Sequence, residues 1–175
     1  MEQQFQYYAF ISYKREDEKW AKWLQDRLRW YKLPSKLCRQ ITRLPKKVWP
    51  VFRDNTDLDS GRLEENIRHE LERSHYLIVI CSPEAARSPW VGKEVKYFAT
   101  LHGADKIIPF VVSGIPYSND IETECIHEQI KAISQEELLA INVREEGIGS
   151  FAMKKKRAFI RVVARLLDIK FNTLW

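Results

Sequence analysis

Residues 76–81 read YLIVIC, a run without a strongly polar side chain, and this run decides the fold. A short run that is apolar at every position indicates a β-strand covered on both faces, because a strand with one solvated face alternates apolar and polar residues. Such strands occur in parallel sheets that have helices packed on both sides. The sequence around the run should therefore alternate between strands and helices.

Strand-type and helix-type patterns do alternate along the whole chain. β-branched and aromatic runs predict strands, and apolar residues spaced three or four apart predict helices. The expected strands are Tyr7–Tyr13, Val48–Phe52, Tyr76–Cys81, Ile107–Val112 and Leu138–Val143. The expected helices are Asp17–Tyr31, Leu63–Arg73, Trp90–His102, Cys125–Ile133 and Phe151–Ile169. This alternation predicts an α/β fold, a doubly wound five-stranded parallel sheet with helices on both faces.

Length and composition are typical of one globular domain. The chain has 175 residues, of which 45% are hydrophobic and 30% charged, so we expect one domain over residues 1–175 with its core at about 7–169. Three widely spaced cysteines, Cys38, Cys81 and Cys125, predict reduced thiols and a cytoplasmic location. No stretch approaches the roughly 20 apolar residues of a membrane span, and the N-terminus lacks the pattern of a secretory signal.

Positive charge is concentrated in two places, within a net charge of +5. No acid occurs between Arg27 and Arg53, where the basic residues are Arg27, Arg29, Lys32, Lys36, Arg39, Arg43, Lys46, Lys47 and Arg53. The second cluster is Lys154, Lys155, Lys156, Arg157, Arg161 and Arg165. Nucleic acid is one interpretation of such clusters. We favour solvated helix faces, because apolar residues recur at helical spacing within the second cluster, and we expect neither a nucleic-acid nor a membrane partner.

Ligands of doubly wound sheets bind outside the carboxyl ends of the strands. The loops at that edge are predicted at Lys14–Asp17, Arg53–Arg62, Ser82–Pro89 and Ser113–Asp120. The first loop brings two cations and an acid, Asp17, that can cap the following helix. Neither GxGxxG nor a P-loop motif is present, and the scattered histidines suggest no metal site. The longest irregular stretch is predicted at Lys32–Lys47.

Three segments at these loops resemble a known family. FISYKRED (residues 10–17), VFRDNTDLDSG (51–61) and IVICSPEAARSPWVGKE (78–94) resemble, in this order, a Toll/interleukin-1 receptor (TIR) domain of the bacterial type. The resemblance extends from Tyr7 to about Ile169. It implies a flavodoxin-like fold, which agrees with the sheet predicted above, and a single TIR domain.

The resemblance also implies an activity. Many bacterial and plant TIR domains cleave the bond between nicotinamide and ribose in NAD⁺, and their catalytic Glu lies near the start of the helix after the third strand. Glu94, within Trp90-x-x-x-Glu94, matches that residue. By itself an acid near a helix start is ordinary, since it faces the positive end of the helix dipole. The family match makes Glu94 the expected catalytic residue of an NAD⁺ hydrolase that needs no bound cofactor.

A single carboxylate suits this reaction. Nicotinamide leaves a pyridinium as a neutral base, so its departure needs no general acid, unlike that of most sugar leaving groups. The cationic ribose left behind needs electrostatic stabilisation, which one carboxylate supplies. We therefore expect Glu94 to be ionised at neutral pH, with a pKa near that of an ordinary acid.

Charged and aromatic residues at the neighbouring strand ends are expected to bind the rest of NAD⁺. Lys14 and Arg15 carry charges suited to the pyrophosphate, and the resemblance points to the same two positions. The remaining binding candidates are Tyr13, Arg53, Asp54 and Trp90. In the family a mobile loop begins where Arg53 and Asp54 lie, and it covers the ligand. Tyr13 and Trp90 would flank the base or form a wall of the pocket.

The resemblance leaves product and partners open. Family products include ADP-ribose, cyclic isomers of it and conjugates with another acceptor. Bacterial members often act against phage, by depleting NAD⁺ or by making a signal for a separate effector, and they assemble through TIR–TIR contacts into homo-oligomers. The main alternative function is a non-catalytic TIR scaffold. A phosphoacceptor receiver domain and a nucleoside-processing transferase are two further alternatives.

Overall fold

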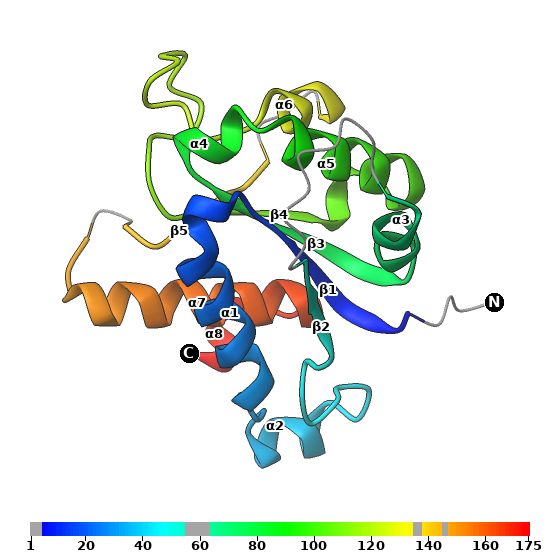
Figure 1. Cartoon of the computed structure of the whole chain (residues 1–175). Helices are drawn as coiled ribbons and strands as arrows, with labels where there is room; N and C mark the ends of the chain where they lie inside the picture. The colour runs from blue at the N-terminus through cyan, green and yellow to red at the C-terminus, as the bar shows by residue number, and fades with distance from the viewer. Residues whose placement is uncertain (1–4, 55–63, 135–137, 145–146) are drawn as a thin grey trace.

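Five parallel strands form one sheet in the order β2-β1-β3-β4-β5 (Figure 1). The computed structural model describes residues 5–54, 64–134, 138–144 and 147–175. The strands are β1 (Tyr7–Ser12), β2 (Val51–Arg53), β3 (Ser74–Cys81), β4 (Ile107–Val111) and β5 (Ile141–Asn142). The five-stranded parallel sheet predicted from the sequence is confirmed.

The strand order creates a switch point between β1 and β3. From β1 the chain crosses to β2 on one side, then returns to add β3 and β4 on the other side. The loops that leave the carboxyl ends of β1 and β3 therefore diverge, and a crevice for a ligand is expected between them. In the register, Ser12 at the end of β1 lies opposite Val79 of β3.

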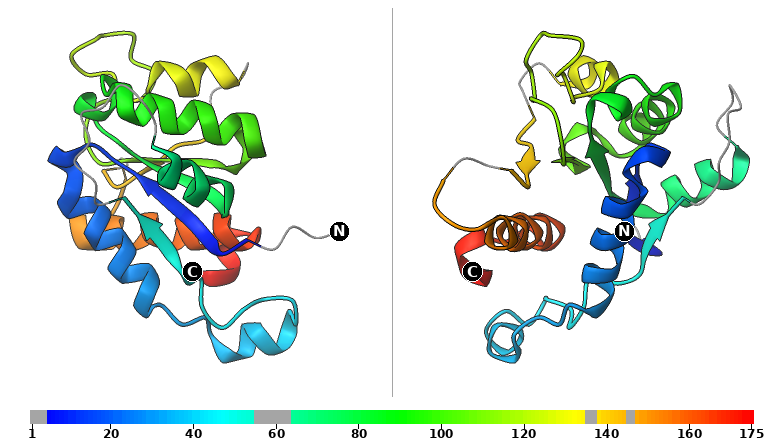
Figure 2. Two further views of the ribbon diagram at one scale, coloured as in Figure 1. Left: turned by 45° about the vertical axis from the view of Figure 1, so that its right-hand side comes forward. Right: turned by 60° about the vertical axis from the view of Figure 1, so that its left-hand side comes forward.

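Helices cover both faces of the sheet, as the views in Figure 2 show. The first core cluster includes buried residues of α1 (Glu18–Trp30), α2 (Ser35–Gln40) and α7 (Phe151–Leu167). The second includes buried residues of α3 (Glu65–Glu72), α5 (Pro89–His102) and α6 (Glu128–Ile133). Shorter helical elements are η1 (Arg15–Asp17), α4 (Pro83–Ala86), η2 (Ala104–Lys106) and α8 (Phe171–Leu174).

Strand β3 belongs to both core clusters, which explains its unbroken apolar sequence. Ile78 and Ile80 point into the first cluster, whereas Leu77 and Val79 point into the second. Successive side chains of a strand alternate between its faces. A strand with helices on both sides therefore needs an apolar residue at every position.

Several element boundaries differ from the predictions. β2 begins at Val51 rather than at Val48. The reason is Pro50, which has no N–H to donate to the sheet. Its carbonyl accepts a hydrogen bond from the Tyr8 amide at 2.9 Å. β5 is much shorter than the predicted Leu138–Val143. The predicted helix Cys125–Ile133 begins only at Glu128. The predicted start of the second expected helix, at Leu63, lies outside the described residues.

The sequence suggested that the segment Lys32–Lys47 is irregular throughout. The structure differs, because the segment contains α2. This helix is too short to show a clear apolar period, and Leu37 is its buried residue. The chain also has no helix, among those described, that is long and apolar enough to cross a membrane.

Candidate functional site

Glu94 lies in the second turn of α5, with its side chain turned into the protein. Ser88 caps this helix, since its hydroxyl accepts a hydrogen bond from the Val91 amide at 3.2 Å, and Pro89 occupies the first helical position. α5 has no acid in its first turn. The explanation of Glu94 as an ordinary first-turn acid is therefore excluded, since the residue does not face the free amides of the helix start.

The Glu94 carboxylate is buried with a single hydrogen-bond donor. Its side chain is 1% exposed, and the Ser12 hydroxyl donates to Oε1 at 3.0 Å. Oε2 has no hydrogen-bond partner among the residues that the structure describes. Ser12 ends β1, so the carboxylate lies at the carboxyl edge of the sheet, next to the switch point. One oxygen is thus fixed in place while the other keeps its capacity to accept.

Glu94 does not titrate like an ordinary acid. Burial raises its pKa well above the usual range, the negative charge of Asp54 raises it further, and the hydrogen bond from Ser12 opposes the shift. The expectation of a near-normal pKa is therefore wrong, because the sequence does not reveal that this side chain is removed from water. A buried carboxylate of this kind responds strongly to any positive charge placed beside it.

Tyr13, Arg53 and Asp54 form one connected group at the ends of β1 and β2. The Arg53 guanidinium donates to the Tyr13 hydroxyl at 2.9 Å and to the Gln25 side chain at 3.0 Å. The Tyr13 hydroxyl in turn donates to the backbone carbonyl of Asp54. Burial raises the pKa of Tyr13, against the effect of Arg53. Arg53 thus ties β1, β2 and α1 together and fixes Asp54 near Glu94.

Lys14 and Arg15 lie immediately after β1, at the same edge of the sheet. Lys14 is half-buried, and Arg15 is exposed at the start of η1. Asp17, which we expected to cap α1, makes no such cap. It accepts a hydrogen bond from the Ser82 hydroxyl, and Ser82 follows β3. This buried pair joins the first and third loops directly across the switch point.

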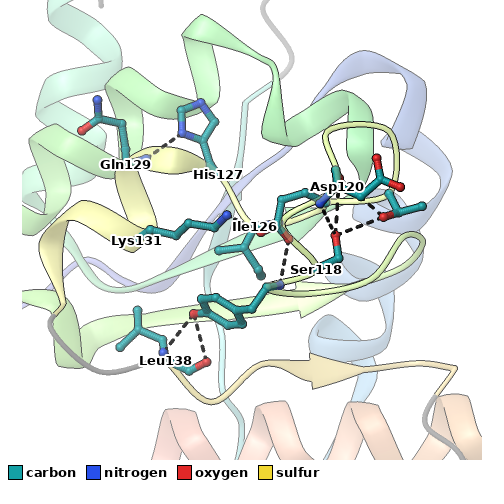
Figure 3. A network of polar contacts seen from close by, with 10 residues as sticks. Ser118, Asp120, Ile126, His127, Gln129, Lys131 and Leu138 are labelled. Atoms are coloured by element: carbon teal, nitrogen blue, oxygen red, sulfur yellow. Dashed lines mark hydrogen bonds and ion pairs between the residues drawn. The ribbon is translucent and has the colours of Figure 1, made fainter.

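His127 braces the helix that carries Glu94. Its Nδ1 accepts from the Gln129 amide at 3.0 Å (Figure 3). Its Nε2 lies 2.9 Å from the Ser88 carbonyl, so Nε2 carries the proton. Burial lowers the pKa of His127, which favours this neutral form. The ring packs on Gly92, where an added Cβ would lie 2.5 Å from the imidazole Cε1. Gly92 therefore permits α5 and α6 to approach closely.

The loop after β4 is held by a second polar network, which Figure 3 also shows. Glu124 forms an ion pair with Lys131 of α6 and accepts from the Tyr117 amide at 2.8 Å. Burial opposes its ionisation, but the hydrogen bonds from Lys131 and the backbone outweigh that effect and lower its pKa. The Tyr117 hydroxyl accepts from the Leu138 amide at 3.0 Å. The fourth loop at this edge is thereby fixed to α6 and to the approach to β5.

The residues predicted for the site come together only in part. Tyr13, Arg53 and Asp54 form a hydrogen-bonded group, and the charge of Asp54 acts on Glu94. Lys14 and Arg15 lie at the same edge. Trp90 is half-buried and packs against the second core cluster. The predicted mobile loop from Asn55 to Gly61 lies outside the described residues.

Sequence reasoning missed Ser12, Ser82 and His127. Two of them carry a positional signal, since Ser12 ends the first strand and Ser82 directly follows the third. Their partners are 82 and 65 residues away along the chain. His127 has no such signal, because its role depends on how two helices pack.

Comparisons with known proteins agree with this architecture. The sequence profile of the TIR domain family matches residues 9–146. The chain is 36% identical over 110 residues to the NAD(+) hydrolase ApTIR of Actinoplanes sp.. These 110 residues are 62% of this chain but only 14% of that protein. The fold resembles the TIR domains of the activated Roq1 resistosome, which directly recognises the pathogen effector XopQ. That likeness has a TM-score of 0.54 at 13% identity, over 88% of this chain and 98% of the other, and shows the fold alone.

Proposed function

This chain belongs to the TIR domain family, and on that premise we propose that it cleaves the nicotinamide–ribose bond of NAD⁺ with Glu94 as the catalytic residue. The identity to a bacterial NAD(+) hydrolase supports the reaction. One observation carries the proposal for the residue. Glu94 is a buried carboxylate at the switch point, with one oxygen held by Ser12 and no described partner for the other.

The chemistry needs a carboxylate in this state. As the bond to nicotinamide breaks, positive charge moves from the pyridinium ring to the ribose. A carboxylate that is already fixed in a site with little water stabilises that charge without reorganising. The Oε2 atom would face the ribose, whereas Oε1 stays with Ser12. Proton donation is unnecessary because nicotinamide leaves as a neutral base.

The raised pKa of Glu94 is compatible with this role if the substrate itself ionises the residue. NAD⁺ brings a positively charged ring to the buried carboxyl, and an opposite charge within a few ångströms lowers the pKa of an acid. Binding of NAD⁺ then releases the proton of Glu94. The free site avoids a buried, unpaired charge, and the charge forms only when its partner is present.

The other residues of the edge are proposed to hold the substrate. Lys14 and Arg15 would bind the pyrophosphate, for which two cations beside a strand end are suited. Arg53 would act through Tyr13 and Asp54, as its hydrogen bonds support. Trp90 would form a wall of the pocket beside the start of α5.

The wider setting is also part of the proposal. Water, a group of the same molecule or a separate acceptor can capture the ribosyl cation, giving ADP-ribose, a cyclic isomer or a conjugate. We take residues 1–175 as one TIR domain that acts in the cytoplasm, as a homo-oligomer, in defence against phage, with a separate effector where the product is a signal. Three free cysteines support the location.

Substitution of Glu94 tests the proposal. Glu94→Gln keeps the shape and the contact with Ser12 but removes the charge, so NAD⁺ consumption should fall on the order of 10²- to 10³-fold. Glu65→Gln, at an exposed position of α3, is the matched control and should leave the rate unchanged. Mass spectrometry of the products identifies which acceptor captures the ribose. Turnover by Glu94→Gln within a few-fold of the parent chain would refute the assignment, and an inactive parent chain would favour the scaffold.

A further inference from the structure

The basic segment of residues 29–47 lies at the end of the molecule opposite to Glu94. Helix α1 begins beside the carboxyl edge of the sheet and runs back, so its last residues reach the amino edge (Figure 1). α2 follows there and projects away from the sheet in both views of Figure 2. A ligand bound at this segment would therefore not contact the NAD⁺ site.

The segment encloses a hollow of about 680 Å³. It is lined by Lys32, Leu33, Ser35, Cys38, Arg39, Lys46 and Lys47. The two sides are joined by a hydrogen bond from the Leu33 amide to the Lys46 carbonyl at 3.0 Å. Four of the seven lining side chains carry a positive charge, and the size is within the range of small-molecule sites.

The four cations of the hollow are not paired with an acid in the part of the chain that the structure describes. Lys32, Arg39, Lys46 and Lys47 make no ion pair with any residue that the structure describes, and the sequence has no acid from Arg27 to Arg53. Like charges around one concave surface add their potentials and attract an anion. The hollow is thus electrostatically suited to phosphate.

This arrangement is anchored rather than loose. Leu33, Leu37 and Leu44 are buried in the first core cluster. The Arg43 guanidinium donates to the carbonyls of Leu167 and Asp168, at 3.1 and 3.3 Å, and so ties the segment to the end of α7. The cations that line the hollow therefore project from a fixed backbone.

An aromatic side chain stands beside the hollow. Trp30 is 70% exposed, and Lys47, which lines the hollow, lies 5.8 Å from the centre of its ring. Arg29 lies 5.2 Å from the same ring. The two cations lie over the exposed indole, so a base that stacks on this ring would have positive charges close to its phosphate.

The cations of the second basic cluster lie against the chain's own rings and carbonyls, as Arg29 and Lys47 lie against Trp30. Lys155 lies 4.7 Å from the ring centre of Trp23, and Arg165 donates to the Ile107 carbonyl at 3.4 Å. Arg157 lies over Trp175 and Arg161 over Phe171. These cations contact the chain's own rings and carbonyls, so the solvated helix face predicted there is only partly correct.

We propose that the hollow and Trp30 together bind single-stranded nucleic acid. Lys32, Arg39 and Lys46 contact the phosphates, and Trp30 stacks with a base. A single strand is favoured over a duplex because stacking on Trp30 needs an unpaired base. This revises the sequence interpretation, in which the basic residues were only a solvated surface. The proposal is independent of NAD⁺ cleavage.

The phosphate contacts are tested by neutralising two of the lining cations. The probe is a fluorescein-labelled oligothymidylate of about 15 nucleotides, followed by fluorescence anisotropy without NAD⁺. In Arg39→Gln/Lys46→Gln, affinity at about 50 mM salt should fall on the order of 10- to 100-fold. The slope of log K against log salt should become shallower by about 1.4, since each single-strand phosphate contact contributes about 0.7. Lys19→Gln/Lys96→Gln removes the same charge from exposed positions of α1 and α5 and should change affinity little.

The stacking contact is tested separately. Trp30→Ala should weaken binding about 5- to 150-fold while leaving the salt slope unchanged, and Trp30→Phe should retain most of the affinity. Because Trp30 is exposed, its replacement should leave the fold intact, and circular dichroism checks this for each variant.

Four outcomes would overturn the proposal. The first is that the parent chain shows no saturable binding of the oligothymidylate at about 50 mM salt, and the second is that the two double variants lose the same affinity. The third is that a duplex of the same sequence binds as tightly as the single strand, and the fourth is that thymidine monophosphate does so. The second would mean that net charge alone attracts the strand. The last would identify a free nucleotide, rather than a strand, as the ligand. The proposal would be supported if the single strand binds preferentially and this binding is lost both in Arg39→Gln/Lys46→Gln and in Trp30→Ala.

Discussion

Folding and the proposed catalysis place opposite requirements on the charge of Glu94. The proposed reaction needs a negative charge on this side chain, whereas burial with one hydrogen-bond donor among the described residues makes that charge costly. The protein meets both requirements if the charge forms only on binding of a cationic substrate. Three predictions follow from this at the level of single residues.

The pH dependence of kcat/KM should differ from that of kcat. kcat/KM reports groups of the free enzyme, where the Glu94 pKa is raised, and kcat reports the complex, where the pyridinium lowers it. Since the ionised carboxylate is the active form, both values fall in acid. The fall of kcat/KM should occur at higher pH than the fall of kcat, in steady-state rates measured from about pH 5 to pH 9. Coincident profiles would mean that NAD⁺ does not ionise Glu94.

Ser12→Ala should shift the same profile. Among the described residues Ser12 alone donates a hydrogen bond to Glu94, and this bond opposes the rise in the Glu94 pKa. Without it the acid limb of kcat/KM should move to still higher pH. Ser12→Thr keeps a hydroxyl and should restore much of the parent profile. A merely structural role of Ser12 would lower stability without moving the limb.

The stability of Glu94→Gln relative to the parent chain should become more favourable as the pH rises. Because the folded chain keeps the Glu94 proton to higher pH than the unfolded chain, the parent loses stability as the pH rises from about 4.5 toward the folded pKa. The loss is about 1.4 kcal/mol per pH unit in that window. Urea unfolding at pH 5 and pH 8, with Glu65→Gln as control, measures the difference. Equal gains at both pH values would show that the Glu94 carboxylate is not desolvated.

At the scale of elements, the close contact of α5 and α6 fixes the position of Glu94. Gly92→Ala would push a methyl group against the His127 ring, which two hydrogen bonds hold in place. We expect a loss of about 1–3 kcal/mol in the free energy of unfolding and a lower rate, because Glu94 is two residues away. Gly92→Ala/His127→Ala should lose less than the sum of the two single variants. Additive losses would show that no clash occurs.

Helices and strands with a clear pattern of apolar residues could be predicted from the sequence, and short ones could not. The burial of β3 on both faces follows from its unbroken apolar run, and α7 follows from its apolar face. β2 was misplaced because Val48 is buried and apolar like a strand residue, although it lies before Pro50 and outside the sheet. α2 was missed because one buried leucine gives no period.

The sequence predicted those parts of the candidate site in which the residue type itself indicates the chemistry. It did not predict the properties that depend on tertiary contacts. Glu94 and the cations of the first loop have such a signal. The pKa of Glu94 depends on its burial, on the charge of Asp54 and on the hydrogen bond from Ser12, and the pairing with Ser12 spans 82 positions. Pairings over such distances are formed by the tertiary fold, and one sequence gives no local pattern for them.

At the scale of the whole molecule, substitutions at the two edges of the sheet should have independent effects on the kinetic constants for NAD⁺. Arg15→Ala, at the carboxyl edge, should raise KM for NAD⁺ about 10- to 150-fold with little change in kcat, because the pyrophosphate is the same in substrate and transition state. Arg39→Gln/Lys46→Gln, at the amino edge, should leave both constants unchanged.

Nicotinamide riboside, which lacks the pyrophosphate, provides the control for Arg15. Its slow cleavage should be the same with and without the Arg15 side chain. If Arg15→Ala lost activity equally on both substrates, Arg15 would support the fold or the reacting centre instead of binding the pyrophosphate.

The three leucines that hold the basic segment to the core have a consequence for how this fold can change. Shortening a surface connection by half alters its closure entropy by only about 0.6 kcal/mol. Removing residues 32–47 would also take away Leu33, Leu37 and Leu44, each at most 7% exposed and each contributing about 1.5–3 kcal/mol by its burial. That sum approaches the total stability of a domain, about 5–15 kcal/mol. A shortened crossover would therefore need new apolar side chains over α1 and α7, so the segment can be redesigned on its outer surface far more readily than it can be deleted.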